Sequence, residues 1–115
     1  MRKGDIVLIK YPFTDLSSTK VRPAIVVSSD EFTNHGEDAI FVCISSQTRN
    51  VLPSDLILSP SDPEFRNSGL RMASSVKIGK IICLSKSLAS RLLGEAGPNM
   101  MQRIKGRLIN ILDLN

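Results

Sequence analysis

The sequence predicts a single, mainly β domain: a small curved antiparallel sheet or barrel that carries one C-terminal helix. Short runs rich in β-branched residues alternate with polar loops, as in small β domains. The last apolar segment has the period of a helix instead. The length of 115 residues suits one compact domain covering residues 1–115.

Six short segments have the composition of strands. The clearest is 24–28, where nearly continuous apolar residues indicate burial on both faces. The segment 74–78 alternates apolar and polar side chains, as a half-buried strand does, and Gly79 predicts a turn or bulge after it. The predicted strands cover residues 5–11, 24–28, 39–44, 56–58, 74–78 and 80–84.

The other segments are predicted as polar connections, except for two helical regions. Residues 30–38 have the composition of a polar loop, and residues 85–94 are predicted to contain a short helical turn. A longer helix begins after Gly97, because the proline that follows suits a first helical turn. Its apolar side chains recur at helical spacing and are expected to pack on the sheet: Met101, Ile104, Leu108, Ile111 and Leu112.

Charge is distributed unevenly along the chain, whose formal net charge is +4. Residues 1–22 carry five basic and two acidic side chains, a net +3, and residues 71–112 carry eight and one, a net +7. Residues 30–64 carry one basic and seven acidic side chains, a net −6. If the two basic ends meet in the fold, they form a face suited to a phosphate backbone or an acidic protein; otherwise they are ordinary solvated surface.

Several functional classes lack their usual signatures. The apolar runs are far shorter than the roughly 18 residues of a membrane span, and residues 1–5 show no signal-peptide core, so a cytoplasmic protein without membrane contact is expected. Cys43 and Cys83 lie in apolar stretches and are predicted to be buried free thiols. Because metal-ligand clusters and a phosphate-binding Gly loop are missing from the sequence, neither a metal nor a cofactor is expected.

Two segments carry side chains that could act on a phosphate. In the first, Pro23 biases Arg22 towards extended backbone, and the planar guanidinium of Arg22 suits phosphate oxygens. In the second, the hydroxyl of Ser45 follows the third predicted strand, where it could hydrogen-bond a phosphate oxygen. Both segments also have the composition of good turns, and that interpretation is favoured when the segments are taken alone.

The order of short motifs along the chain closely resembles the MazF/PemK family of toxins from type II toxin–antitoxin systems. The matching motifs are GDIVLI at 4–9, PFTD at 12–15, KVRPAIVVS at 20–28, ISSQ at 44–47, LP at 52–53, GL at 69–70 and SVKI at 75–78. The resemblance implies an SH3-like barrel of the CcdB/PemK type, a homodimer, and metal-independent, sequence-dependent cleavage of single-stranded mRNA. In that reaction the RNA 2′-OH attacks the adjacent phosphorus and leaves 2′,3′-cyclic phosphate and 5′-OH ends.

The same resemblance implies roles for individual residues. Arg22 would stabilise the pentacovalent phosphorus, and Ser45 would supply a catalytic hydroxyl where the family commonly has threonine. The expected RNA-binding residues are Phe13, Thr14, Asp15, Lys20, Ser46, Gln47, Thr48, Arg49 and Lys77. Gly79 stands where some members carry a carboxylate, which leaves Asp15, a water or the phosphate itself as the general base.

A cognate antitoxin with an acidic tail is the expected protein partner, because the basic C-terminal region would attract such a tail as it attracts RNA. Two alternatives remain open. A CcdB-like toxin of the same fold would bind DNA gyrase without any enzymatic step and would not need the arginine and hydroxyl pair. A catalytically decayed member would bind RNA or the antitoxin without cleaving RNA, and the glycine at position 79 favours this alternative.

Overall fold

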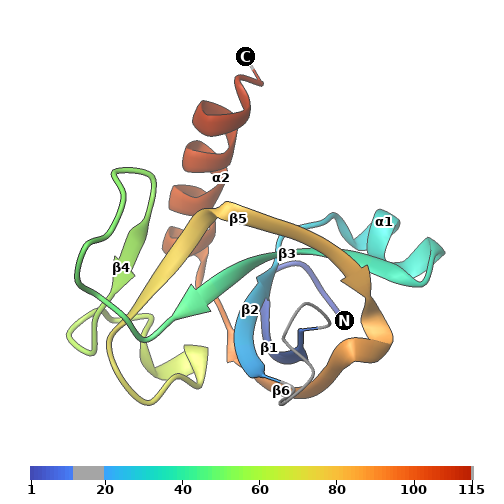
Figure 1. The fold of residues 1–115 in the computed structure, drawn as a ribbon, viewed down its shortest axis with the longest axis horizontal. Helices are drawn as coiled ribbons and strands as arrows, with labels where there is room; N and C mark the ends of the chain where they lie inside the picture. The colour runs from blue at the N-terminus through green and yellow to red at the C-terminus, as the bar shows by residue number, and fades with distance from the viewer. Residues whose placement is uncertain (12–19, 115) are drawn as a thin grey trace.

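A computed structural model describes residues 1–11 and 20–114. Its strands form one curled antiparallel sheet, a half-barrel from which the C-terminal helix α2 stands out (Figure 1). The strands are β1 (Asp5–Lys10), β2 (Val21–Val26), β3 (Asp38–Ser45), β4 (Leu56–Leu58), β5 (Ser74–Ser85) and β6 (Ala89–Glu95). They lie side by side in the order β4-β5-β3-β2-β1-β6. The prediction of a mainly β fold with a C-terminal helix is confirmed.

The predicted loop at 30–38 is wrong in part, because it contains helix α1 (Asp30–His35). Ser29 caps this helix: its Oγ accepts a hydrogen bond from the Phe32 amide at 3.1 Å. Serine before two acidic residues is a known signal for a helix start, since both satisfy the unpaired amides of the first turn. The signal was therefore present in the sequence.

The predicted helical turn at 85–94 is also wrong in extent. Only η2 (Lys86–Leu88) is helical; Ser85 ends β5, and the residues from Ala89 onward form the edge strand β6 by pairing with β1. Gly94 lets β6 pass close to another segment, because a Cβ at this position would lie 2.3 Å from the Asn67 carbonyl oxygen. These constraints come from chain segments far away in sequence, so local patterning does not reveal them.

The two strands predicted on either side of Gly79 are one long strand, β5. Val42 of β3 pairs with Ile81, and the next residue, Cys43, pairs with Lys77. Residues 78–80 are therefore left without a partner on β3 and form a bulge, which confirms the bulge predicted at the glycine. The bulge brings residues from both halves of β5 towards the ends of β2 and β3.

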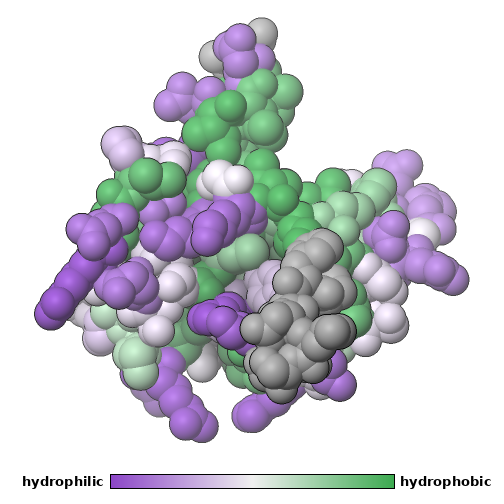
Figure 2. Space-filling model, viewed as in Figure 1, coloured by the Kyte–Doolittle hydropathy of each residue, from purple (hydrophilic) through white to green (hydrophobic). Residues whose placement is uncertain are grey.

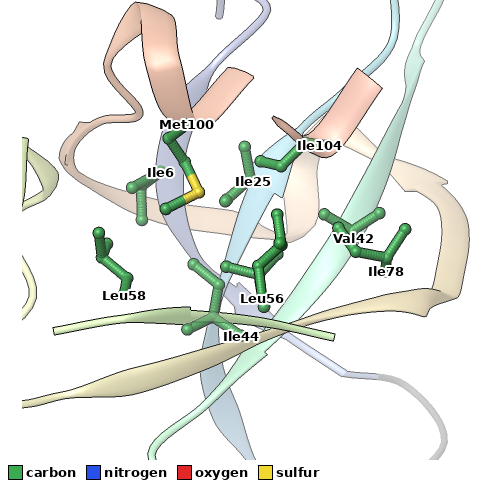
Figure 3. Packing of buried hydrophobic residues seen from close by; sticks show 10 residues of the cluster. Ile6, Ile25, Val42, Ile44, Leu56, Leu58, Ile78, Met100 and Ile104 are labelled. Atoms are coloured by element: carbon green, nitrogen blue, oxygen red, sulfur yellow. The ribbon is translucent and has the colours of Figure 1, made fainter. Parts of the chain in front are cut away.

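The sheet buries apolar side chains on both faces, which explains the nearly continuous apolar sequence of its central strands. The cluster under α2, shown in Figure 3, consists of Ile6, Ile25, Val42, Ile44, Leu56, Leu58, Val76, Ile78, Met100 and Ile104. The cluster on the opposite face consists of Val7, Ile9, Ala24, Val26, Ala39, Phe41 and Leu84. Successive residues of a strand belong to opposite clusters. In the same way, successive polar residues at the strand ends lie on opposite faces of the sheet.

Helix α2 (Pro98–Leu112) begins where the sequence predicts and packs against the buried cluster through Met101, Ile104 and Leu108, but its last turn does not. Met100 and Ile104 are buried, and the predicted packing is wrong for Ile111 and Leu112, which are 38% and 49% exposed. Figure 2 shows apolar surface continuing along the helix beyond the sheet. Among the described helices, none has both the length and the hydropathy required to cross a membrane.

Candidate active site

The candidate site lies where β2 and β3 stop pairing. Their ladder ends at Ala24 and Cys43, and two further residues in the same register would set Arg22 opposite Ser45. Pro23 suits this break, because proline has no N–H to give to a neighbouring strand. The alternation of side chains along each strand places Arg22 and Ser45 on the same face of the sheet as Cys43, just beyond the last paired residues.

A hollow of about 510 Å³ lies between these strand ends, and we call it the first hollow. The polar side chains that line it include Tyr11, Lys20, Arg22, Ser45, Lys77 and Lys80. Four of these are cationic, and no acidic side chain of the described residues lines the hollow. Lysine and arginine from the basic start of the chain here meet lysines from its basic C-terminal part. The fold therefore joins the two basic regions at one point.

The positive charge of Lys77 is offset by the carboxylate of Asp55, which does not line the hollow. Lys77 Nζ lies 2.9 Å from Asp55 Oδ2, and the two side chains are 16% and 1% exposed. Burial by itself would raise the pKa of Asp55, but the hydrogen bonds from Lys77 and the Leu52 amide, with the charges of Lys77 and Lys80, hold it below its usual value. This is the single ion pair between described residues, so Lys20, Arg22 and Lys80 have no acidic partner among them.

Ser45 is fixed by the turn that follows β3. Its Oγ accepts a hydrogen bond from the Gln47 amide at 3.0 Å, and Gln47 Oε1 accepts one from the Arg49 amide at 2.9 Å. Ser75 Oγ donates to the Gln47 carbonyl at 2.7 Å and ties the turn to β5. A hydroxyl that accepts a hydrogen bond can still donate its own proton, so Ser45 can donate to a phosphate oxygen in the hollow.

Tyr11 closes one side of the first hollow, where its hydroxyl donates to Cys43 Sγ at 3.0 Å. Burial is the main factor that raises the pKa of Tyr11; the bond to Cys43 raises it further, and the nearby charge of Arg22 lowers it only in part. The phenol therefore keeps its proton at neutral pH. The cysteines are free as predicted, but Cys43 is only half-buried and Cys83 is exposed, so their predicted burial is wrong.

The remaining predicted residues are distributed around the site. Ser46 points to the opposite face from Ser45 and lines a different hollow, described below. Gln47, Thr48 and Arg49 lie on the exposed turn. The predicted RNA-binding residues Phe13, Thr14 and Asp15 lie outside the described residues.

Lys80 is the lining residue that the sequence predictions missed. It lies next to the exposed Gly79 in the β5 bulge, and a lysine beside a predicted bulge is the signal that could have identified it. Across residues 1–11 and 20–114, His, Cys, Asp and Glu side chains nowhere gather in threes as a metal site would require.

A family model of PemK-like, MazF-like toxins of type II toxin–antitoxin systems matches residues 2–112. The chain belongs to this family. The match spans the strands that carry Arg22 and Ser45 and continues to the last residue of α2, so the predicted resemblance is confirmed.

Solved structures share the fold of this toxin. An endoribonuclease from a mycobacterial species, in complex with its cognate antitoxin, is 23% identical with a TM-score of 0.78 over 100% of this chain and 97% of that one. Another mycobacterial endoribonuclease is 25% identical with a TM-score of 0.73 over 98% and 91%. The MazE–MazF structure from Deinococcus radiodurans is 18% identical with a TM-score of 0.79 over 100% and 97%. No curated protein matches the sequence significantly.

Proposed function

We propose that this toxin is an endoribonuclease that cuts single-stranded mRNA at sequence-dependent sites without a metal. The observation that carries the proposal is that Arg22 and Ser45 line one hollow whose described lining residues include four cations and no acid. Such a site favours an anion, and an arginine and a hydroxyl are suited to phosphate oxygens. The mycobacterial structures described as endoribonucleases support the same activity.

The reaction uses a nucleophile that the RNA itself supplies. The 2′-oxygen bonds to the adjacent phosphorus while its proton leaves, and the bond from phosphorus to the 5′-oxygen breaks as that oxygen gains a proton. Arg22 donates to the phosphate oxygens as negative charge builds on them, and Ser45 donates a second hydrogen bond. The products carry 2′,3′-cyclic phosphate and 5′-OH ends. DNA lacks the nucleophile and is left uncut.

Two polar side chains at or near the hollow are excluded as the general base. Tyr11 keeps its proton because its pKa is raised, so it does not remove a proton from the 2′-OH. Asp55 is engaged by Lys77 and by the Leu52 amide. Asp15, a water or a phosphate oxygen therefore remains as the proton acceptor. Lys20 and Lys80 attract the RNA backbone, and Lys77 does so less because Asp55 offsets its charge.

Two features of the surface of this toxin indicate two protein partners. A cognate antitoxin with acidic segments would cover the first hollow, because such segments compete with RNA for the same cations. A second copy of the chain would cover the apolar end of α2, where Ile111, Leu112 and Leu114 are exposed. We accordingly expect a homodimer that acts on mRNA in the cytoplasm and is held inactive by its antitoxin.

The test is cleavage of a long single-stranded RNA in EDTA by the wild type and by Arg22→Ala. The wild type should cut, and loss of the guanidinium should slow cutting by about 100- to 1,000-fold, the usual effect of removing one key donor to a developing oxyanion. Arg2→Ala is the matched control, because Arg2 is exposed and outside the hollow, and it should cut at a normal rate.

Other results would support one of the two alternative functions or exclude Arg22 from the reaction. A folded wild type that cuts no RNA in any sequence context and binds DNA gyrase would identify a CcdB-like toxin. Tight RNA binding without product would identify a decayed member of the family. Cutting by Arg22→Ala at the wild-type rate would remove Arg22 from the chemistry.

A further inference from the structure

A second hollow, of about 360 Å³, lies on the other face of the sheet at the same strand ends. Its apolar lining includes Leu8, Leu70, Met72 and Leu93, and its polar lining includes Arg71 and Arg91. Arg22 lines both this hollow and the first. The family assignment and the proposed chemistry give this second hollow no role.

Strand pairing explains why these residues meet. Leu8 of β1 pairs with Pro23 on one side and with Arg91 on the other, so the three form a row across β2, β1 and β6. Side chains in such a row lie on one face of a sheet. Ser46, the first residue after β3, also lines this hollow.

The segment that carries Arg71 is held firmly against β6. Gly69 has φ of +73°, and a Cβ at this position would lie 2.0 Å from the Leu93 carbonyl oxygen. Only glycine permits both the left-handed backbone and this close approach. The close approach at Gly69 brings the segment that carries Arg71 next to β6, so Arg71 and Arg91 line one site although twenty positions separate them in the sequence.

The lining has a specific chemical preference. Three arginines line the second hollow, and none of its described lining residues is acidic. Most of its other lining residues are apolar. A ligand that fits must combine an anion with a flat apolar face, and arginine both pairs with phosphate and stacks on aromatic rings. A nucleotide has both properties, and unstacked RNA bases are commonly recognised in this way.

We propose that the second hollow binds one nucleotide next to the scissile phosphate, with Arg71 and Arg91 selecting its base. The inference rests on the proposed RNA cleavage. The scissile phosphate lies at Arg22, one neighbouring nucleoside occupies the first hollow, and the other crosses the strand ends into the second. Arg22 lines both hollows, which lie on opposite faces of the sheet. A phosphate bound at Arg22 would therefore have one flanking base in each hollow. The second hollow is thus a determinant of the cleavage sequence.

The test compares the wild type, the double variant Arg71→Ala/Arg91→Ala and the control Arg2→Ala. Cuts in a long single-stranded RNA are mapped by sequencing the new ends, which gives the nucleotide preference on each side of the cut. The double variant should cut at least tenfold more slowly and lose its preference at one flanking position. The control should keep both rate and preference, since Arg2 borders neither hollow.

The conservative variant Arg71→Lys/Arg91→Lys separates stacking from charge and serves as well if the alanine variant fails to fold. Lysine keeps the charge but not the planar group. This variant should keep its affinity for a random-sequence, fully 2′-O-methylated RNA 10-mer, which cannot be cut, and should still lose the flanking preference. Uniformly slower cutting with an unchanged preference would mean that the arginines touch phosphates only, and would overturn the proposal.

Failure of the further inference differs from failure of the proposed function. If the wild type cuts no RNA, the proposed activity is wrong, and only binding of the methylated 10-mer tests whether the second hollow binds a nucleotide. At least fivefold weaker binding by the alanine variant supports nucleotide binding there. Equal binding by the two proteins rejects it. If the alanine variant keeps its RNA affinity and cleavage pattern but no longer holds a co-expressed antitoxin, the hollow belongs to the antitoxin, and the proposal is rejected.

Discussion

The basic residues at the broken β2–β3 ladder differ sharply from those elsewhere in the fold. Arg107 Nη1 donates to the Pro53 and Asp55 carbonyls at 2.6 and 3.2 Å, and Lys86 Nζ donates to the Thr33 carbonyl at 2.6 Å. These side chains join distant segments. In the described structure, Arg22 at the ladder break forms no such hydrogen bond or ion pair.

The difference shows which charges support the fold and which are available to a ligand. Three of the eight basic residues between 71 and 112 are fixed by partners: Lys77, Lys86 and Arg107. Lys77 lines the first hollow but is paired, and net charge alone counts all three equally with Lys20, Arg22 and Lys80, which line that hollow without an acidic partner among the described residues. The following predictions test whether the two groups can be separated by mutation.

Asp55→Ala should produce the largest loss of stability. Removing one partner of a buried pair costs about 3–5 kcal/mol, and because Lys77 retains some contact with water we expect a loss of about 2–3 kcal/mol in urea unfolding. Because the pKa of Asp55 is lowered in the fold, its stabilising effect is complete at neutral pH and is lost as the pH falls below about 4. The variant should lack this component of acid sensitivity.

Cleavage per folded molecule should not fall in Asp55→Ala, since Lys77 then gains a free charge beside the hollow. A loss of tenfold or more in a folded sample would show instead that the carboxylate takes part in the chemistry.

Ser45→Ala should affect cleavage more than the fold. Loss of one hydrogen bond to a charged phosphate should slow cutting about tenfold, equivalent to about 1.4 kcal/mol, while loss of the bond from the Gln47 amide should cost about 0.5–1 kcal/mol of stability. Single-turnover rates and thermal unfolding measure the two effects. Ser45→Thr, which keeps the hydroxyl, is the control and should cut within about threefold of the wild type. Equal rates for the alanine and threonine variants would exclude a role for the hydroxyl.

Glu64→Ala should produce the smallest effect, confined to stability. The Glu64 carboxylate accepts hydrogen bonds from the Asn99 and Met100 amides at 2.9 and 2.8 Å and so caps the start of α2. Loss of such a cap costs about 1 kcal/mol. Urea unfolding should detect this loss with the rate of RNA cleavage unchanged. A changed cleavage pattern would link this cap to the active site.

The sequence predicted the residues of the site better than it predicted their arrangement. Arg22 before Pro23 signals an arginine at a strand end, and the motif order identifies the family. That Arg22 and Ser45 line the same hollow follows from the register of β2 and β3, which depends on pairing between segments far apart. The ion pair of Lys77 with Asp55 was likewise not predictable from local patterns, because Lys77 lies on β5 and Asp55 precedes β4, 22 positions away in the sequence.

The fold was predictable wherever a local signal agrees with the final contacts. The start of α2 follows from its proline, and β4 follows from its short apolar run. Strand β6 was missed because it is defined by pairing with β1 and not by alternation. Arg71 and Arg91 contributed only to the charge count, since nothing local indicates that they share a hollow.

The central claim is that the RNA supplies its own nucleophile to a phosphate held at Arg22. The most direct measurement is end-group analysis of an RNA cut in EDTA, beside the same RNA with a 2′-deoxy substitution at the mapped cleavage position. The account predicts 2′,3′-cyclic phosphate and 5′-OH ends, and no cut at the substituted position. Cutting of the 2′-deoxy RNA, or 3′-OH and 5′-phosphate ends, would contradict it.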